Sequence, residues 1–143
     1  MKEIFCLNKE ALPTMPVPHD CVVERIQMDG RYLTFVFEDD ISYHDSIRRT
    51  APEAKSLIIR CHLTDEDSFS VYKWKKPGKL FRKQGYYVCL ENSKLTRPSK
   101  NKIEYLYHNI GFSSIIIKLF SGEMVIVDAE ADYVEYEWTG RLL

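Results

Sequence analysis

Alternating polar and apolar residues on either side of Asp29-Gly30 predict a β-hairpin. One alternating segment covers residues 21–28 and the other covers residues 31–38. Asp-Gly favours a two-residue type I′ turn, because both central residues of that turn adopt positive φ. The chain is therefore expected to reverse direction at these two residues.

This turn also predicts which residues of the hairpin face one another. Side chains alternate between the two faces of a strand, so a slip of one residue would exchange the faces. The expected cross-strand pairs are Ile26 with Leu33 and Val22 with Phe37 on one face, and Gln27 with Tyr32 and Arg25 with Thr34 on the other.

Further segments with the same two-residue period continue the β pattern. They cover residues 56–63, 69–75, 86–90, 103–108, 112–120, 124–128 and 133–138. A second hairpin signal stands at Ser121-Gly122. The pairs expected from it are Ile117 with Ile126 and Leu119 with Met124.

Three stretches lack a clear strand period. Residues 1–20 contain three prolines that exclude a helix, so they are expected to form an irregular lead-in. Residues 39–54 are expected to form a long connection, in which only residues 41–44 suggest a poor edge strand. Residues 91–100 have room for one or two helical turns, because Pro98 limits the length of any helix there.

Together these segments predict an all-β, mainly antiparallel fold: a β-sandwich or open barrel of about eight strands with at most one short helix. With 143 residues, 45% of them hydrophobic, the chain is expected to form a single β-rich domain over residues 1–143. The residues expected in its core are Leu33, Phe35, Phe37, Leu57, Ile59, Ile117, Ile126, Tyr136 and Trp138.

Apolar runs and cysteines bear on where the protein works. No apolar run at the N-terminus has the length of a signal-peptide core, and no segment approaches a membrane span, so a cytoplasmic protein is expected. The four cysteines are widely separated, without a Cys-x-x-Cys pair, and are expected to be free thiols. Zinc would need closely spaced ligand pairs, so neither a metal nor another cofactor is expected.

The net charge of −1 conceals a strong asymmetry. Residues 1–71 carry 13 acids and 8 bases, residues 72–102 carry 1 acid and 10 bases, and residues 103–143 carry 7 acids and 2 bases. Within residues 72–102, the stretch 72–87 combines six bases and five aromatic residues with no acid. The candidate partner-binding residues of this stretch are Lys73, Trp74, Lys75, Lys76, Lys79, Arg82 and Lys83.

Three interpretations of this basic segment remain open. Bases that follow phosphates, combined with rings that stack on nucleobases, are typical of single-stranded nucleic-acid binding. The same residue types suit the recognition of an acidic protein surface, with tryptophan, tyrosine and arginine as anchors. The third interpretation is structural: lysines of a hairpin protect the edge of a sheet from aggregation.

Two His-Asp dipeptides, His19-Asp20 and His44-Asp45, are the only other candidates for chemistry. They suggest a metal site or a base with an orienting carboxylate, but aspartates also close turns by bonding to their own backbone. Acidic triplets at residues 38–40 and 65–67 lack the spacing of a calcium loop. Neither a nucleophile elbow nor a phosphate-binding glycine loop is present. The sequence therefore predicts a protein that is not an enzyme.

The order of the segments carries a resemblance. His19-Asp20-Cys21-Val22-Val23 leads into the first hairpin, residues 108–117 read HNIGFSSIII, and residues 133–138 read YVEYEW. This arrangement resembles small uncharacterised β-rich cytosolic proteins of low-GC Gram-positive bacteria and, more distantly, the immunity proteins of polymorphic toxin systems. The resemblance implies a non-enzymatic β protein that binds a partner protein, and a nucleic-acid-binding domain that uses residues 72–87 is the alternative.

Overall fold

The computed structural model describes residues 1–78 and 84–140, and the elements that it contains confirm an all-β, antiparallel fold. Within these residues nine strands form one sheet. The strands are β1 (Lys2–Cys6), β2 (Val22–Asp29), β3 (Tyr32–Phe37), β4 (Ala54–Leu63), β5 (Phe69–Lys75), β6 (Tyr86–Leu90), β7 (Ile103–Gly111), β8 (Ser114–Phe120) and β9 (Met124–Gly140). The helical elements are α1 (Asp45–Thr50) and the short 3-10 helix η1 (Asn92–Lys94).

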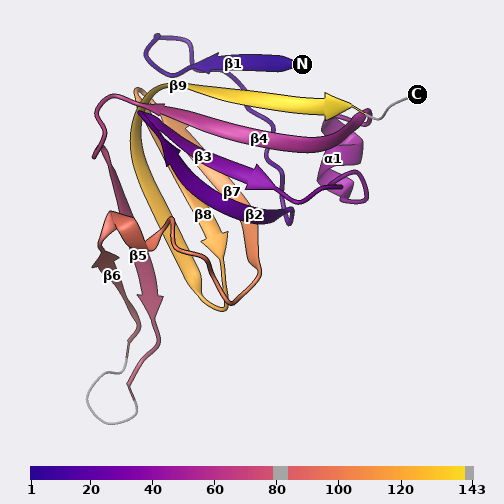
Figure 1. Cartoon of the computed structure of the whole chain (residues 1–143). Helices are drawn as coiled ribbons and strands as arrows, with labels where there is room; N and C mark the ends of the chain where they lie inside the picture. The colour runs from indigo at the N-terminus through magenta and orange to yellow at the C-terminus, as the bar shows by residue number, and fades with distance from the viewer. Residues whose placement is uncertain (79–83, 141–143) are drawn as a thin grey trace.

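The sheet closes on itself as a barrel. In the order β4-β3-β2-β7-β8-β9, the last strand β9 pairs with its neighbour β8 and also with β4 at the other end. Among the described residues, two residue pairs join β2 and β7, Val22 with Glu104 and Val23 with Ile103. Tyr105 of β7 adds backbone hydrogen bonds with Asp20 and Cys21, just before β2. The β5–β6 hairpin continues the sheet beyond the barrel and projects from its lower left in Figure 1.

The long strand β9 serves both halves of the barrel. Its first half pairs with β8 and β5, and its second half pairs with β4 and β1. Between the halves, His62 pairs with Tyr133 and Leu63 with Ala131, so Asp132 is the extra residue of a β-bulge. The bulge changes which residues face inward, from the odd positions before it to the even positions after it. One strand can therefore keep apolar residues in the core of both halves. Figure 1 shows the curve of β9 around the barrel.

The predicted register of the first hairpin was wrong by two residues. Asp29 pairs with Tyr32, so the turn residues are Gly30, with a φ of +63°, and Arg31. Glycine with positive φ at the first turn position is the type II′ pattern. The observed pairs are Ile26 with Phe35, Met28 with Leu33, Gln27 with Thr34, and Arg25 with Val36. A shift of two residues leaves the faces unchanged, and Ile26 remains in the core.

A β-bulge shifts the register at the far end of the same hairpin. The register shifts between Val23 and Arg25, and Val23 rather than Val22 lies opposite Phe37. Val23 is accordingly buried, whereas Val22 is half-buried.

The second hairpin differs from its prediction by one residue. Phe120 pairs with Met124 across a three-residue loop that contains Gly122 with a φ of +74°. Ile117 therefore lies opposite Val127, and Ile126 lies opposite Lys118 on the outer face. Since one residue of shift exchanges the faces, Ile126 is half-buried and is not part of the core. The other eight residues expected in the core are buried.

Two segments contain elements that the sequence did not suggest. Residues 2–6 form β1, because the second half of β9 offers a free edge with which they pair. The expected connection at residues 39–54 contains α1, whose Ile47 is buried against the barrel. The helical turn expected within residues 91–100 is present as η1.

Candidate functional site

The β5–β6 hairpin separates the aromatic residues of the basic segment from its bases. Cross-strand partners share one face of a sheet, and the pairing places Lys73 beside Val88 and Lys75 beside Tyr86. Trp74 pairs with Tyr87, and these two residues point to the opposite face. Lys73 and Lys75 therefore lie on a different surface from Trp74.

The face that carries Trp74 continues across the sheet as an apolar surface, which we call the outer aromatic face. It consists of Tyr72, Trp74 and Tyr87 from β5 and β6, Met124 and Ile126 from β9, Ile116 and Phe120 from β8, and Tyr107 from β7. Three of its rings are strongly exposed, at 43% for Tyr87, 50% for Tyr107 and 42% for Phe120. A contiguous apolar surface of this kind is typical of an interaction site.

Charged groups are sparse on the outer aromatic face. Lys118 lies near its centre, between Tyr107 and Ile126, and is half-buried. Asp128 lies at one margin, opposite Ile116, and Glu104 lies at another, opposite Phe120. Depletion of charge around aromatic and methionine side chains is the composition of the central part of a protein–protein interface.

Trp74 is held in place by its own hairpin. Its ring meets that of Tyr87 edge-on, with 5.0 Å between the ring centroids. A Cβ atom at position 85 would overlap the six-membered ring of Trp74, so the indole packs where only glycine leaves room. The tryptophan is therefore fixed on the outer aromatic face before any partner arrives.

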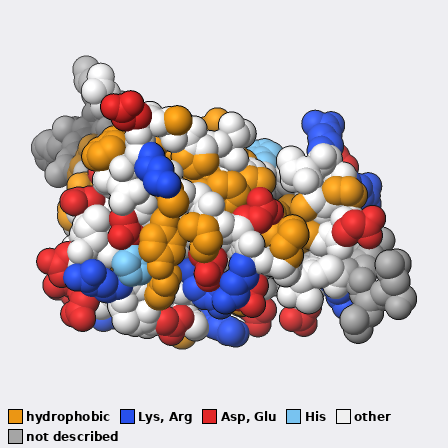
Figure 2. Space-filling model, turned by 90° about the horizontal axis from the view of Figure 1, so that it is seen from above, with side chains coloured by type: hydrophobic (Ala, Val, Ile, Leu, Met, Phe, Trp, Pro, Cys, Tyr) orange, Lys and Arg blue, Asp and Glu red, His pale blue; other side chains and the backbone are white. Residues whose placement is uncertain are grey.

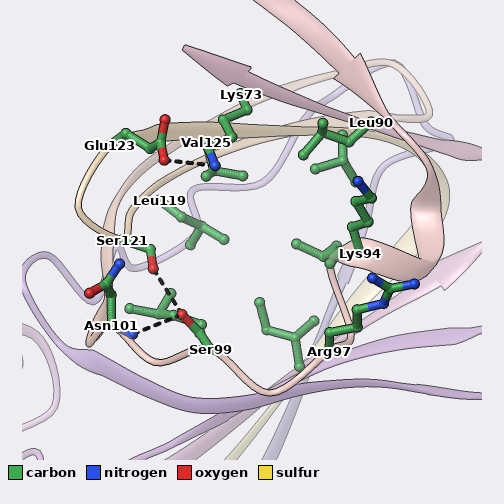
Figure 3. A pocket seen from close by; sticks show the side chains of 14 residues that line it. Lys73, Leu90, Lys94, Arg97, Ser99, Asn101, Leu119, Ser121, Glu123 and Val125 are labelled. Carbon is green, nitrogen blue, oxygen red and sulfur yellow. Dashed lines mark hydrogen bonds and ion pairs between the residues drawn. The ribbon is translucent and has the colours of Figure 1, made fainter. Parts of the chain in front are cut away.

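The inner side of the same hairpin borders a pocket of about 320 Å³ at the mouth of the barrel (Figure 3). Its aliphatic lining includes Leu119 and Val125 from the β8–β9 hairpin and Ile26 from β2. Lys73, Lys94 and Arg97 line it as well, together with the acid Glu123. Three bases of residues 72–102 thus lie around this pocket.

Of the three bases at the pocket, Lys73 alone has an acidic partner among the described residues. The Lys73 ammonium lies 2.7 Å from the Glu123 carboxylate, which neutralises it. Lys94 and Arg97 form no ion pair with any residue that the structure describes. Their head groups lie on the same side of the pocket, across from Ser121 and Glu123 (Figure 3).

The four candidate partner-binding residues that the structure describes do not form one basic face. Lys73 is half-buried and neutralised, whereas Lys75 and Lys76 are exposed. Trp74 is half-buried on the opposite face. Lys79, Arg82 and Lys83 lie outside the described residues. These bases were expected on one continuous exposed face, with Trp74 at least partly accessible. The half-buried, neutralised Lys73 contradicts the first expectation, whereas the half-buried Trp74 agrees with the second.

The edge-protection interpretation fails for Lys73 and stays a prediction for Lys75. Lys73 lies between Val125 of β9 and Val88 of β6, so it stands on an inner strand and cannot shield an edge. Lys75 pairs with Tyr86 of β6 alone. The edge strand β6, with the sequence YYVCL, contains no charged residue.

The two His-Asp dipeptides do not build a common site. His19 is exposed and hydrogen-bonds through Nδ1 to the Leu106 carbonyl, and its neighbour Asp20 adopts a positive φ of 66°. His44 contacts Glu38 at 3.0 Å instead of Asp45. No group of three or more histidine, cysteine or acidic side chains in the described residues could hold a metal ion.

A polar cluster that sequence reasoning missed lies on the opposite half of the barrel, over β3, β4 and β9. His62 stacks on Tyr133 with 4.6 Å between the ring centroids, and the hydroxyls of Tyr32 and Tyr133 are 2.5 Å apart. On the same strands Arg60 donates to Glu135 at 2.9 Å and to Glu137 at 2.6 Å. Only the register of β4 against β9 brings these residues together.

Arg60 offsets part of the negative charge of this cluster. The Arg60 guanidinium lowers the pKa of Glu137, and the view from above, over β1, β4 and β9, shows acidic and basic side chains side by side (Figure 2). Hydrogen bonding to Tyr32 raises the pKa of the Tyr133 hydroxyl to about 12. The cluster therefore offers a set of satisfied cross-strand pairs, which stabilise the sheet.

Cysteines provide no activated nucleophile in the core. All four are free thiols. Burial raises the pKa of Cys21 and of Cys61 to about 12, so both thiols stay protonated at neutral pH. Cys61 is a small apolar core residue, as its place in the alternation predicts.

Comparison of the chain with protein-family models, with curated proteins and with solved structures finds no match. No helix in the described residues is long and apolar enough to cross a membrane.

Proposed function

We propose that this chain is a non-enzymatic binding protein that docks a partner protein on its outer aromatic face. The observation that carries the proposal is the row of exposed rings and aliphatic side chains from Tyr87 to Tyr107, with a single charged residue near its centre. Aromatic anchors on a rigid sheet lose little conformational entropy when they are buried by a partner. The four free thiols suit a protein of the reducing cytoplasm.

The same geometry disfavours the nucleic-acid alternative. A platform for a single strand needs rings that stack on bases and cations that follow phosphates on one surface. In the described hairpin Trp74 and Tyr87 lie on the face opposite to Lys73 and Lys75. Lys118 is the basic residue near the centre of the aromatic surface, and one cation matches few phosphates. The resemblance to immunity proteins makes a cognate toxin the first partner to test.

Site-specific photo-crosslinking in the producing cell tests the proposal. A photoreactive phenylalanine at position 120 should form one discrete adduct with a partner protein. The matched control is position 4, where Ile4 is 53% exposed on β1 in the other half of the barrel, and no adduct should form there. Equal labelling from both positions would contradict a docking surface on the outer aromatic face.

Binding of the identified partner to the purified chain gives the second measurement. Phe120→Asp should weaken binding at least ~10-fold, because a charge replaces a ring at the interface, whereas Ile4→Asp should leave it unchanged. A labelled single-stranded oligonucleotide provides the contrast at about 150 mM salt, where nonspecific contacts between exposed charges are screened. Oligonucleotide binding that is lost in Lys75→Gln/Lys76→Gln and kept in Phe120→Asp would replace protein docking with the nucleic-acid function.

A further inference from the structure

The apolar part of the lining of the pocket at the mouth of the barrel is aliphatic throughout the described residues. Seven aliphatic residues contribute to it and no aromatic residue does, among the described residues. They are Ile26, Val71, Leu90, Leu95, Ile103, Leu119 and Val125. The volume of about 320 Å³ is at the lower end of the range for small-molecule sites.

Four parts of the fold that are distant in sequence build this lining. They are β2, the β5–β6 hairpin, the segment 94–103 and the β8–β9 hairpin. Val71 and Leu119 come from β5 and β8 and are each 1% exposed, so they form a floor that belongs to the barrel core. The segment after η1 closes one side with Leu95, which is buried as well. The pocket is thus held open by packed strands rather than by one adaptable loop.

The polar rim is divided into a satisfied side and an unsatisfied side. On the satisfied side, Ser99 and Ser121 hydrogen-bond to each other at 3.2 Å, and Lys73 is neutralised by Glu123. On the other side stand Lys94 and Arg97, whose charges have no acidic partner among the described residues. Figure 3 shows both head groups at this side of the hollow, with the aliphatic side chains between them and Ser121.

We propose that this pocket binds an aliphatic anion, a chain of methylene groups that ends in a carboxylate or a phosphate. The chain would lie on Leu119, Val125 and Ile26, because aliphatic burial is favourable and does not demand the flat shape of a ring. The head group would lie between Lys94 and Arg97, since a guanidinium matches an oxyanion in bidentate geometry. This site is independent of the outer aromatic face, from which β5 and β6 separate it.

Titration of the isotope-labelled full chain with sodium octanoate, followed by amide chemical shifts, tests the proposal. Saturable shifts are expected at Leu119, Val125 and the segment 94–97, with a dissociation constant in the range of about 10 μM to 1 mM. Acetate lacks the chain and octylamine reverses the head-group charge, so neither should produce these shifts. Octyl phosphate in a parallel titration shows which of the two head groups binds more tightly.

Charge variants provide the decisive comparison. Lys94→Gln/Arg97→Gln should weaken octanoate binding at least ~10-fold, because both unpaired cations are removed. Lys100→Gln is the matched control, since Lys100 is an exposed base of the same segment that does not line this pocket, and it should change the affinity less than twofold. Val125→Phe would fill the pocket and abolish binding, with circular dichroism reporting whether the sheet remains intact.

Three results would overturn the proposal. They are the absence of saturable shifts up to ~10 mM octanoate, equal affinity in Lys94→Gln/Arg97→Gln, and shifts centred on Phe120 and Tyr107 of the outer aromatic face. The last outcome would show an apolar chain adsorbed on the docking surface, with the pocket left empty.

Discussion

The His62 ring nitrogen Nδ1 lies 2.6 Å from the Asp132 carboxylate at the bulge where β9 passes from one half of the barrel to the other. The backbone carbonyl of the same Asp132 accepts a hydrogen bond from the Leu7 amide at 2.8 Å. One residue therefore ties β4, β9 and the segment after β1 together. A bulge that changes the facing of a strand needs such local partners, because the extra residue is excluded from the regular ladder.

Removal of this carboxylate should destabilise the bulge. Asp132→Ala is expected to lower the free energy of unfolding by about 1–3 kcal/mol, the usual range for a lost hydrogen bond to a charged group. Asp128→Ala, on the exposed side of the same strand, should change it by less than ~0.5 kcal/mol. Urea unfolding of both variants makes the comparison, and equal stabilities would mean that the bulge forms without this contact.

The core prediction concerns Phe35, which is fully buried and meets the Tyr105 ring edge-on at 6.5 Å. Phe35→Ala should cost about 3–5 kcal/mol in denaturant melts, since a large cavity is left inside the barrel. Phe120→Ala should cost less than ~1 kcal/mol, because Phe120 already contacts water on the outer face. A small loss for Phe35→Ala would show that the barrel collapses around the vacated space.

Acid should destabilise the fold through His108. Burial lowers the pKa of His108, whose neutral ring accepts from the Tyr105 hydroxyl at 2.7 Å and bonds to the Met15 backbone. The unfolded chain binds the proton at its ordinary pKa of about 6.5, so the contribution to stability is complete above pH 6.5 and is lost as the pH falls below it.

Urea melts at pH 7.5 and pH 5 measure this effect. His108→Gln should be less stable than the natural chain at pH 7.5 but should lose less stability on acidification. All other titratable groups are common to both proteins, so the difference between their pH dependences isolates His108. If the variant keeps the pH dependence of the natural chain, His108 binds its proton equally well in the folded and the unfolded chain.

The position of Trp74 depends on Gly85. Gly85→Ala should displace the indole, because the added methyl group would occupy the place of its six-membered ring. In a Trp138→Phe background the fluorescence of Trp74 should shift in wavelength, while the far-ultraviolet circular dichroism of the sheet is retained. The matched change Gly78→Ala, at an exposed residue beyond β5, should leave the emission unaltered. The same emission in both variants would contradict the close packing of Trp74 on this hairpin.

Local patterns in the sequence determined much of the fold. Alternation around residues 31–38 and 56–63 placed Phe35 and Ile59 in the core, because a half-buried strand must send its apolar residues to one side. The all-β class followed from the number of such segments and the turn residues between them. Local chemistry also indicated both hairpins, at Gly30 and Gly122, although not their registers.

Registers, bulges and the two candidate sites were decided by tertiary structure. Asp-Gly is compatible with more than one turn, and the packing of Ile26 against Phe35 selects among them. Asp132 becomes a bulge only because β9 must serve two halves of a barrel, and β1 forms only because β9 leaves an edge for it.

The two proposed binding surfaces also depend partly on local sequence and partly on tertiary structure. Composition identified residues 72–87 as exceptional, but the alternation of β5 and its pairing with β6 put Trp74 and Lys73 on opposite faces. The residues that complete each surface, Tyr107 on one side and Arg97 on the other, come from segments that share a surface with β5 only in the folded chain. Contacts of such long range depend on the closure of the whole barrel, so no local pattern in the sequence could specify them.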